Sequence, residues 1–356
     1  MRRKNALRRL CLTSFVVLFT VVSVSTDYFS VPIISLANSV IKLNLREPII
    51  EAVAVENIAP TETAGEIAQV TTKATEKATV QSTTAKAVAA ASDAKGKIKT
   101  QTLGFTGSTN VANIHIANKT GRTIDVAAQL KIKPDFTIYK NAKPQVLIVH
   151  THATEGYFPK ESDVYYNSWA TRTTDNSKNT IAVGAVIAKR LNDAGIVTIH
   201  DKTQHDAQAY NGSYERARKT ISSYLKKYPS IDVVLDIHRD AITYDDGTKL
   251  SPIVEIDGKK AAQIMIATGC NSGKITDHDN WIENFRFAIR LQQSCEKQYG
   301  KFARSMYFVS KKYNHDLTPG SLLIEMGSEA NTLEQALYSA ELLSNSLIPV
   351  LEDLQN

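Results

Sequence analysis

The sequence of 356 residues contains little cysteine and no CxxC pair. Its three cysteines are Cys11, Cys270 and Cys295. Cys11 stands in an apolar run, and the two others are more typical of unpaired core positions, although they could pair outside the cell. The spacing therefore excludes a disulfide framework and a zinc site made of thiolates.

The sequence also has almost no charge excess beyond its first nine residues. The chain has 42 Lys and Arg residues and 36 Asp and Glu residues. Residues 1–9 hold five of the basic residues and no acid, so the rest of the chain has 37 basic and 36 acidic residues. An excess confined to one terminus is not the footprint of a nucleic-acid-binding surface. We therefore expect no nucleic acid among the partners.

Long hydrophobic runs are equally scarce, and one stands out. Residues 10–24, LCLTSFVVLFTVVSV, carry no charge, and this length fits either a short membrane span or the core of a signal peptide. Apolar character resumes over residues 29–36, and no convincing small-x-small cleavage site follows. This favours an uncleaved anchor at residues 10–25, with residues 1–9 as a cytoplasmic tail and the rest of the chain outside the cytoplasm. A cleaved signal peptide is the alternative.

Aromatic residues are nearly absent between residues 59 and 100, where Ala, Thr, Lys and Ser dominate. Such a segment buries too little apolar surface to offset the entropy of ordering it. We expect residues 26–108 to be a low-complexity linker and residues 109–356 to be the working domain.

Strand-like and helix-like patterns alternate in the working domain, which predicts an α/β fold. Residues 146–149 form a short apolar run typical of a strand buried on both faces. Residues 180–192 place apolar side chains at helical spacing, and Gly195 ends that helix. Further strands are expected near residues 196–199, 232–237, 262–267, 305–309 and 321–325, and further helices over residues 214–224, 280–299 and 333–354.

Polar side chains with metal-binding or proton-transfer chemistry follow three of these strands. They are His150, His152 and Glu155; Asp236, His238, Arg239 and Asp240; and Glu325. Because ligand sites of open α/β sheets lie outside the carboxyl ends of the strands, the three groups are expected to converge. Two imidazoles with a further ligand can hold a catalytic zinc ion, and a free glutamate beside it can move a proton.

Each group also has an ordinary structural interpretation. A lone histidine at a strand end is more often hydrogen-bonded than metal-bound, and Asp236 or Asp240 could pair with Arg239. His150 and His152 face the same side if the strand continues, but a turn after His150 would separate them. His205 and Asp206, with Tyr210 and Tyr214, form either a substrate wall or a solvated turn.

Four ordered segments resemble the stage II sporulation protein P family, the membrane-anchored peptidoglycan hydrolases of endospore-forming bacteria. The similarity covers residues 113–354, and the segments are VLIVHTHATEGYF, HDKTQHDAQAYNGSYERARKTI, VVLDIHRDA and NHDLTPGSLLIEMGSEANTLEQA. More distantly, the chain is similar to zinc-dependent N-acetylmuramoyl-L-alanine amidases, which implies a mixed, mostly parallel sheet flanked by helices.

The amidase resemblance implies roles for individual residues. His152 and His238 match the two histidine ligands of zinc, and Glu325 matches the catalytic glutamate. The middle ligand of the amidases is a glutamate at the start of the helix that begins here near Thr180, where this chain has none. Glu155 is the first candidate for the third ligand, with Asp175 or Asn176 as alternatives.

The resemblance further implies cleavage of the amide between N-acetylmuramic acid and L-alanine, and also of stem-peptide cross-links, during engulfment of the forespore. It implies peptidoglycan as substrate, and a lytic transglycosylase and a multi-span membrane protein as partners. The alternative function is a non-catalytic scaffold that binds peptidoglycan in the same cleft.

Overall fold

The computed structural model describes residues 93–107 and 109–356, which all belong to the second of the chain's two units, Pro48–Asn356. The expected basic tail, the expected anchor at residues 10–25 and most of the expected linker lie outside the described residues. Within the described part of the chain, no helix is both long and apolar enough to cross a membrane.

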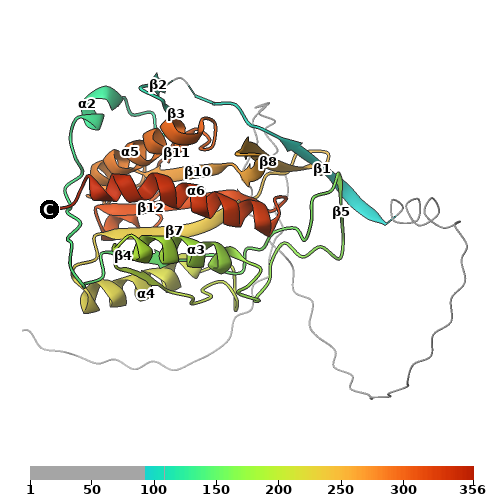
Figure 1. The fold of residues 1–356 in the computed structure, drawn as a ribbon, viewed down its shortest axis with the longest axis horizontal. Helices are drawn as coiled ribbons and strands as arrows, with labels where there is room; N and C mark the ends of the chain where they lie inside the picture. Colours follow the sequence, from blue (N-terminus) through green and yellow to red (C-terminus); the bar gives the residue numbers. More distant parts are fainter. Residues whose placement is uncertain (1–92, 108) are drawn as a thin grey trace, which may run out of the picture. The chain divides into compact units, whose positions relative to one another are not determined.

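An eight-stranded sheet forms the centre of the fold, with the strand order β2-β3-β11-β10-β12-β7-β4-β6 (Figure 1). Its strands are β2 (Thr109–Val111), β3 (Ile114–Asn118), β4 (Val146–Val149), β6 (Thr198–His200), β7 (Val233–Asp240), β10 (Ile264–Gly269), β11 (Met306–Val309) and β12 (Gly320–Ser328). All neighbouring pairs are parallel except β2 with β3 and β10 with β12. The expected α/β fold with a mixed, mostly parallel sheet is thus confirmed.

Helices cover both faces of this sheet. They are α2 (Val126–Leu130), α3 (Thr180–Asp193), α4 (Ser213–Lys227), α5 (Trp281–Tyr299), the 3-10 helix η1 (His315–Leu317) and α6 (Leu333–Glu352). Local sequence sets their starts, because Asn179 caps α3 by accepting a hydrogen bond from the Ile181 N–H, and Thr332 and Gln335 form a capping box on α6. In Figure 1, α3, α5 and α6 lie in front of the sheet.

The core divides between the two faces because successive strand residues point in opposite directions. In β4, Val146 and Ile148 join the large cluster packed with α3, α5 and α6, whereas Leu147 and Val149 join a smaller cluster with Ile221 of α4. Full burial of such a side chain contributes about 1.5–3 kcal/mol. The face with the smaller cluster therefore carries less apolar packing, and by strand alternation Asp236, His238 and Glu325 lie on this face.

A second sheet of four strands has the order β5-β1-β8-β9 and was not expected from the sequence. Its strands are β1 (Ala94–Gln101), β5 (Val164–Tyr166), β8 (Lys249–Ile256) and β9 (Lys259–Ala262). The expected linker, residues 26–108, therefore overlaps β1. Backbone pairing with β5 and β8 holds this strand, whereas Ile98 is its one buried residue, so its side-chain pattern carries no strand signal.

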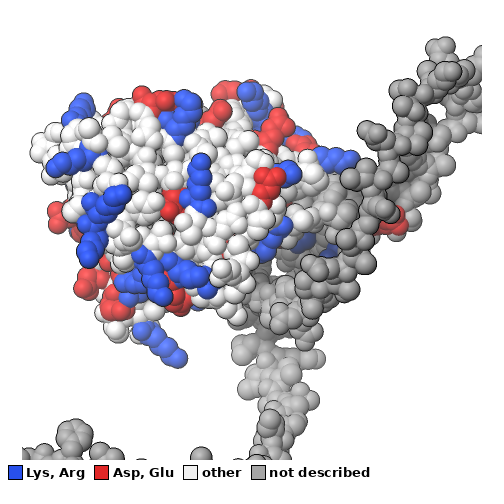
Figure 2. Space-filling view, turned by 90° about the horizontal axis from the view of Figure 1, so that it is seen from below, with Lys and Arg blue, Asp and Glu red and all other residues white. Residues whose placement is uncertain are grey.

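Charged side chains of both signs are interspersed on the face shown in Figure 2, with uncharged residues between them. This distribution agrees with the near balance of acids and bases in the sequence after residue 9.

Candidate active site

Three adjacent parallel strands, β4, β7 and β12, bring the predicted site residues together at their carboxyl ends. Glu325 of β12 lies in register with His238 of β7, and Val149 at the end of β4 lies in register with Asp236. His152 follows β4 within a turn over residues 151–154. Asp236 holds this turn, since its carboxylate accepts hydrogen bonds from the Thr151 N–H at 2.8 Å and from the Thr151 hydroxyl at 2.6 Å.

His152 and His238 are buried neighbours. Their ring centroids lie 5.3 Å apart, and the rings are perpendicular. Glu155 also lies beside His238, with 3.6 Å between its Oε2 and the His238 Nδ1. The Arg239 N–H donates to the same oxygen at 3.0 Å. Two imidazoles and a carboxylate, the ligand types that zinc prefers, therefore lie within one cluster.

Charge around His238 favours its protonated form. Its Nε2 lies 3.0 Å from the Asp236 Oδ1, although the structure gives this nitrogen no hydrogen bond to any described residue. Burial opposes the charge, but the carboxylates of Asp236 and Glu155 outweigh burial and raise the pKa of His238 to about 10. Burial, together with the charge on His238, lowers the pKa of His152 to about 3. Without a metal ion, one imidazole is charged and the other is neutral.

Glu325 has the character of a proton-transfer group. Its side chain is partly exposed, yet its Oε2 is buried and has no hydrogen-bond partner in the described part of the chain. Burial, and next the charge of Asp240, raise the pKa of Glu325 to about 8. A carboxyl group with a pKa near neutrality can both accept and donate a proton at physiological pH.

Two tyrosines contact His152. The ring of Tyr210 stacks on the imidazole at a centroid distance of 4.3 Å, and the ring of Tyr214 meets it edge-on at 5.6 Å. Tyr210 is 43% exposed, so one side of it faces solvent. Both tyrosines that the sequence assigned to either a substrate wall or a solvated turn therefore lie beside His152.

Asp206 and Arg172 complete this side of the site. The Asp206 Oδ2 accepts hydrogen bonds from Arg172 at 2.7 Å and from the Thr154 hydroxyl at 2.6 Å, and it lies 3.8 Å from the His152 Nδ1. The guanidinium of Arg172 also lies over the ring of Tyr210, 4.8 Å from its centroid. Sequence reasoning missed Arg172, because it stands in an irregular segment with no periodic pattern.

His150 points away from this cluster. Its Nδ1 lies 3.1 Å from the Ile237 carbonyl, and its Nε2 lies 2.9 Å from the Nε2 of His200. A Cβ at Gly184 of α3 would come within 2.7 Å of the His150 ring, so the ring packs closely against that helix. The turn after β4 thus separates the two histidines, and His152 is the one beside His238.

The other candidates take structural positions. Asp175 accepts hydrogen bonds from Ser177, and Asn176 accepts one from Gln204, both in the loop before α3. His205 meets the Thr220 hydroxyl at 2.9 Å. Within the described part of the chain, no hydrogen bond, ion pair or ring contact joins any of these three to His152 or His238.

Arg239 and Asp240 lie at the end of β7. The Arg239 guanidinium donates to the carbonyls of Gly156 at 3.0 Å and Thr171 at 2.6 Å, so it fixes the segment that carries Glu155. Asp240 pairs with Arg304 at 3.0 Å. Arg304 is a second residue that sequence reasoning missed.

The described residues contain no group of three or more His, Cys, Asp or Glu side chains already arranged to hold a metal ion. His152 and His238 are nevertheless neighbours, and Glu155 lies beside His238. These three are therefore the candidates for binding a divalent cation.

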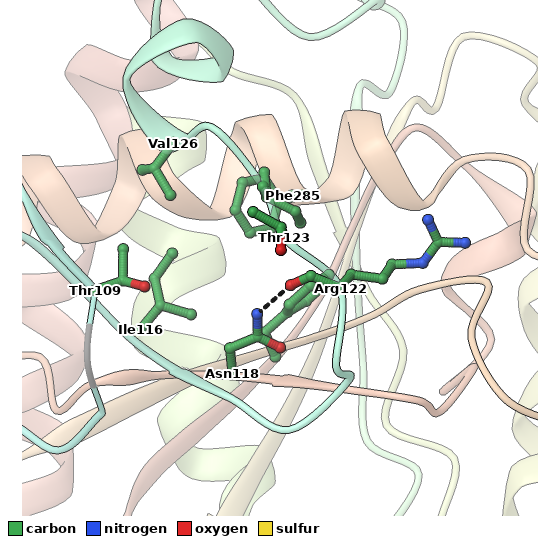
Figure 3. A pocket seen from close by; sticks show the side chains of 9 residues that line it. Thr109, Ile116, Asn118, Arg122, Thr123, Val126 and Phe285 are labelled. Carbon is green, nitrogen blue, oxygen red and sulfur yellow. Dashed lines mark hydrogen bonds between the residues drawn. The ribbon is translucent and has the colours of Figure 1, made fainter.

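A cavity of about 210 Å³ lies elsewhere, between α5 and the β3 side of the sheet (Figure 3). In it, the Asn118 amide donates a hydrogen bond to the Arg122 carbonyl at 2.8 Å. The lining residues are Thr109, Ile116, Asn118, Arg122, Thr123, Ile124, Val126, Phe285 and Phe308. None of them belongs to the histidine cluster, and the lining holds no carboxylate or imidazole.

Comparison with known families gives one match over most of the chain. The model of the family described as Stage II sporulation protein P matches residues 26–348. Stage II sporulation protein P of Bacillus subtilis (strain 168) is 29% identical over 214 residues, which cover 56% of this chain and 49% of that protein. The alignment thus spans about half of the relative's length.

Solved structures of amidases also match, at low identity. The N-acetylmuramoyl-L-alanine amidase AmiC2 of Nostoc punctiforme is 12% identical with a TM-score of 0.34, over 60% of this chain and 99% of that one. The CwlD amidase of Clostridioides difficile, solved in complex with the GerS lipoprotein, is 12% identical with a TM-score of 0.37, over 59% and 98%.

Proposed function

Since this chain belongs to the stage II sporulation protein P family, we propose that it is a zinc-dependent peptidoglycan hydrolase. The proposed reaction is cleavage of the amide between N-acetylmuramic acid and L-alanine, with stem-peptide cross-links as a second substrate. The observation that carries the proposal is the convergence of His152, His238 and Glu325 from three parallel strands.

The chemistry of the donors fits zinc. His152, His238 and Glu155 would hold the ion, because two imidazoles and a carboxylate are ligand types of zinc and the Glu155 Oε2 lies 3.6 Å from the His238 Nδ1. A zinc ion in such a site supplies polarisation of a carbonyl and a lower pKa for a bound water molecule. Because His238 is protonated without metal, binding must release a proton.

Glu325 moves the proton in this proposal. Its ionised carboxylate accepts a proton from the attacking water and then delivers it to the leaving amine. With a pKa of about 8 in the absence of metal, its ionised fraction increases as the pH rises through neutrality. A nearby cation favours the ionised form further.

The side chains around His152 position the substrate. Tyr210 and Tyr214 offer aromatic surfaces on two sides of the imidazole. Asp206 and Arg172 brace the turn that carries His152, which keeps the imidazole in a fixed place relative to Glu325.

We also propose that residues 10–25 anchor the chain in the membrane and that the domain acts outside the cytoplasm. The partners proposed from the family are a lytic transglycosylase and a multi-span membrane protein of the engulfment machinery.

Metal removal tests the proposed function. The purified full-length chain is treated with a chelator, and release of dye from labelled sacculi is followed with and without added zinc. We expect release only with zinc, and mass spectrometry should find freed stem peptides that begin with an L-alanine amino group. Equal release without metal would contradict the zinc assignment. Binding of sacculi with neither stoichiometric zinc nor freed peptides would favour the scaffold function.

A further inference from the structure

Arg304 lies two residues before β11 and reaches across to Asp240 at the end of β7. Its Nη1 donates to the Asp240 Oδ2 at 3.0 Å. The residue is 8% exposed, and Asp240 is 7% exposed. The guanidinium is therefore held by a carboxylate at one end and is largely removed from bulk solvent.

The remaining donors of Arg304 are unused. Its Nε and Nη2 are both buried, and neither has a hydrogen-bond partner in residues 93–107 or 109–356. These two N–H groups lie along one edge of the planar guanidinium, the edge that binds a carboxylate through two parallel hydrogen bonds. Burying such donors without an acceptor is unfavourable, so the edge is suited to an acceptor that comes from outside the domain.

Other arginines of the domain do not show this feature. The Arg239 guanidinium donates to two carbonyls, and Arg218 forms a bidentate pair with Asp316. In Arg190 and Arg290, Nε is the one buried nitrogen without a hydrogen-bond partner among the described residues. Arg304 is thus distinguished by two buried, unpaired donors on one edge.

Arg304 is connected to the neighbourhood of Glu325 through Asp240. Asp240, which holds Arg304, is two residues after His238 on β7, and His238 is the register partner of Glu325. The charges of Asp240 and Arg304 both act on the Glu325 carboxyl, the first raising its pKa and the second lowering it. Glu325 is partly exposed, so a ligand can approach its carboxyl group from solvent.

We propose that the Nε and Nη2 edge of Arg304 is a subsite for a free carboxylate on the peptide part of the substrate. This subsite rests on the proposed function, because it assumes a peptide-bearing substrate at Glu325. A carboxamide at the same position offers one acceptor and turns N–H donors toward the guanidinium, so it binds poorly there. A phosphate is disfavoured, because Asp240 would repel its second negative charge.

A pair of substrates tests the subsite. Each pair consists of two synthetic N-acetylmuramoyl peptides that differ in one side group, which is a free carboxylate in the first peptide and a carboxamide in the second. One such pair is made for each acidic position of the peptide. The zinc-loaded full-length chain should cleave the acid at one position with a kcat/KM at least tenfold above that of the amide. The Arg304→Gln and Arg304→Lys variants should lose this preference, because neither presents two parallel donors.

The ratio of kcat/KM for the acid to kcat/KM for the amide is measured for each protein separately. A smaller fraction of folded enzyme lowers both values equally, so it does not change this ratio. Arg290→Gln on α5 is the matched control and should keep the wild-type ratio. A wild-type ratio near one at every position overturns the subsite, even if neither Arg304 variant folds. A ratio unchanged in the Arg304 variants also overturns it.

Binding separates this proposal from the hydrolase function. Calorimetry measures the affinity of the same peptides for the Glu325→Gln chain, with and without Arg304→Gln. If wild type cleaves nothing but the Glu325→Gln chain binds the acid more tightly through Arg304, the subsite stands and the hydrolase function fails. If wild type cleaves acid and amide equally, the hydrolase function stands and the subsite fails.

Discussion

The metal-free protein should lose stability as the pH rises from 7 to 9, because His238 holds a proton in the folded state. The pKa of this imidazole is raised from 6.5 to about 10 by Asp236 and Glu155, against the opposing effect of burial. A raised folded-state pKa gives stability that is complete below pH 6.5 and is lost as the pH rises toward 10.

The magnitude follows from the proton count. Between pH 6.5 and 10 the folded state binds up to one more proton than the unfolded state at this site, so the free energy of unfolding falls by up to about 1.4 kcal/mol for each pH unit. From pH 7 to pH 9 the expected loss is about 2.5 kcal/mol, which is a large part of the stability of an ordinary domain.

The assay is urea unfolding of the full-length chain at pH 7, 8 and 9 in the presence of a chelator. The control is the double variant Asp236→Asn with His238→Gln, which replaces the charged pair by neutral groups of similar shape and so leaves no unpaired buried charge. The difference between the two pH profiles reports the charged pair, together with its effect on the titration of Glu325. If the two profiles run parallel, His238 does not hold a proton in the folded state and the electrostatic argument is refuted.

Three substitutions give further tests. Glu325→Gln should keep stoichiometric zinc and lower the release of dye from labelled sacculi by at least about 100-fold. The control Glu334→Gln, on the first turn of α6, should change neither zinc content nor release. Substantial residual release by the Glu325→Gln variant would remove Glu325 from the proton-transfer role. His152→Ala should lose zinc, measured by atomic emission, while His150→Asn should retain it, and the reverse result would exchange their roles. Gly184→Ala should lower the free energy of unfolding by about 1–3 kcal/mol, because its Cβ would meet the His150 ring at 2.7 Å, and unchanged thermal unfolding would show that this contact relaxes at little cost.

The sequence alone determined the main secondary structure of the working domain. The apolar run at residues 146–149 is β4 with the expected bounds, and the helical spacing after Asn179 gives α3. These predictions succeed because burial on both faces of a strand, or along one side of a helix, leaves a periodic pattern in the chain. The positions of His152, His238 and Glu325 after or near the ends of buried strands follow from the same pattern.

The tertiary structure decided which of these residues meet. The turn after β4 places His152 beside His238 and leaves His150 against α3, although both histidines follow the same strand. β1 was not recognised, because backbone hydrogen bonds to β5 and β8 hold it while Ile98 is its one buried side chain.

The arginines of the site depend most on tertiary structure. Arg172 and Arg304 reach Asp206 and Asp240, which lie 34 and 64 residues away in the sequence. Ion pairs over such separations leave no periodicity, so the sequence supplied the chemical groups, while the order of strands in the sheet determined their neighbours.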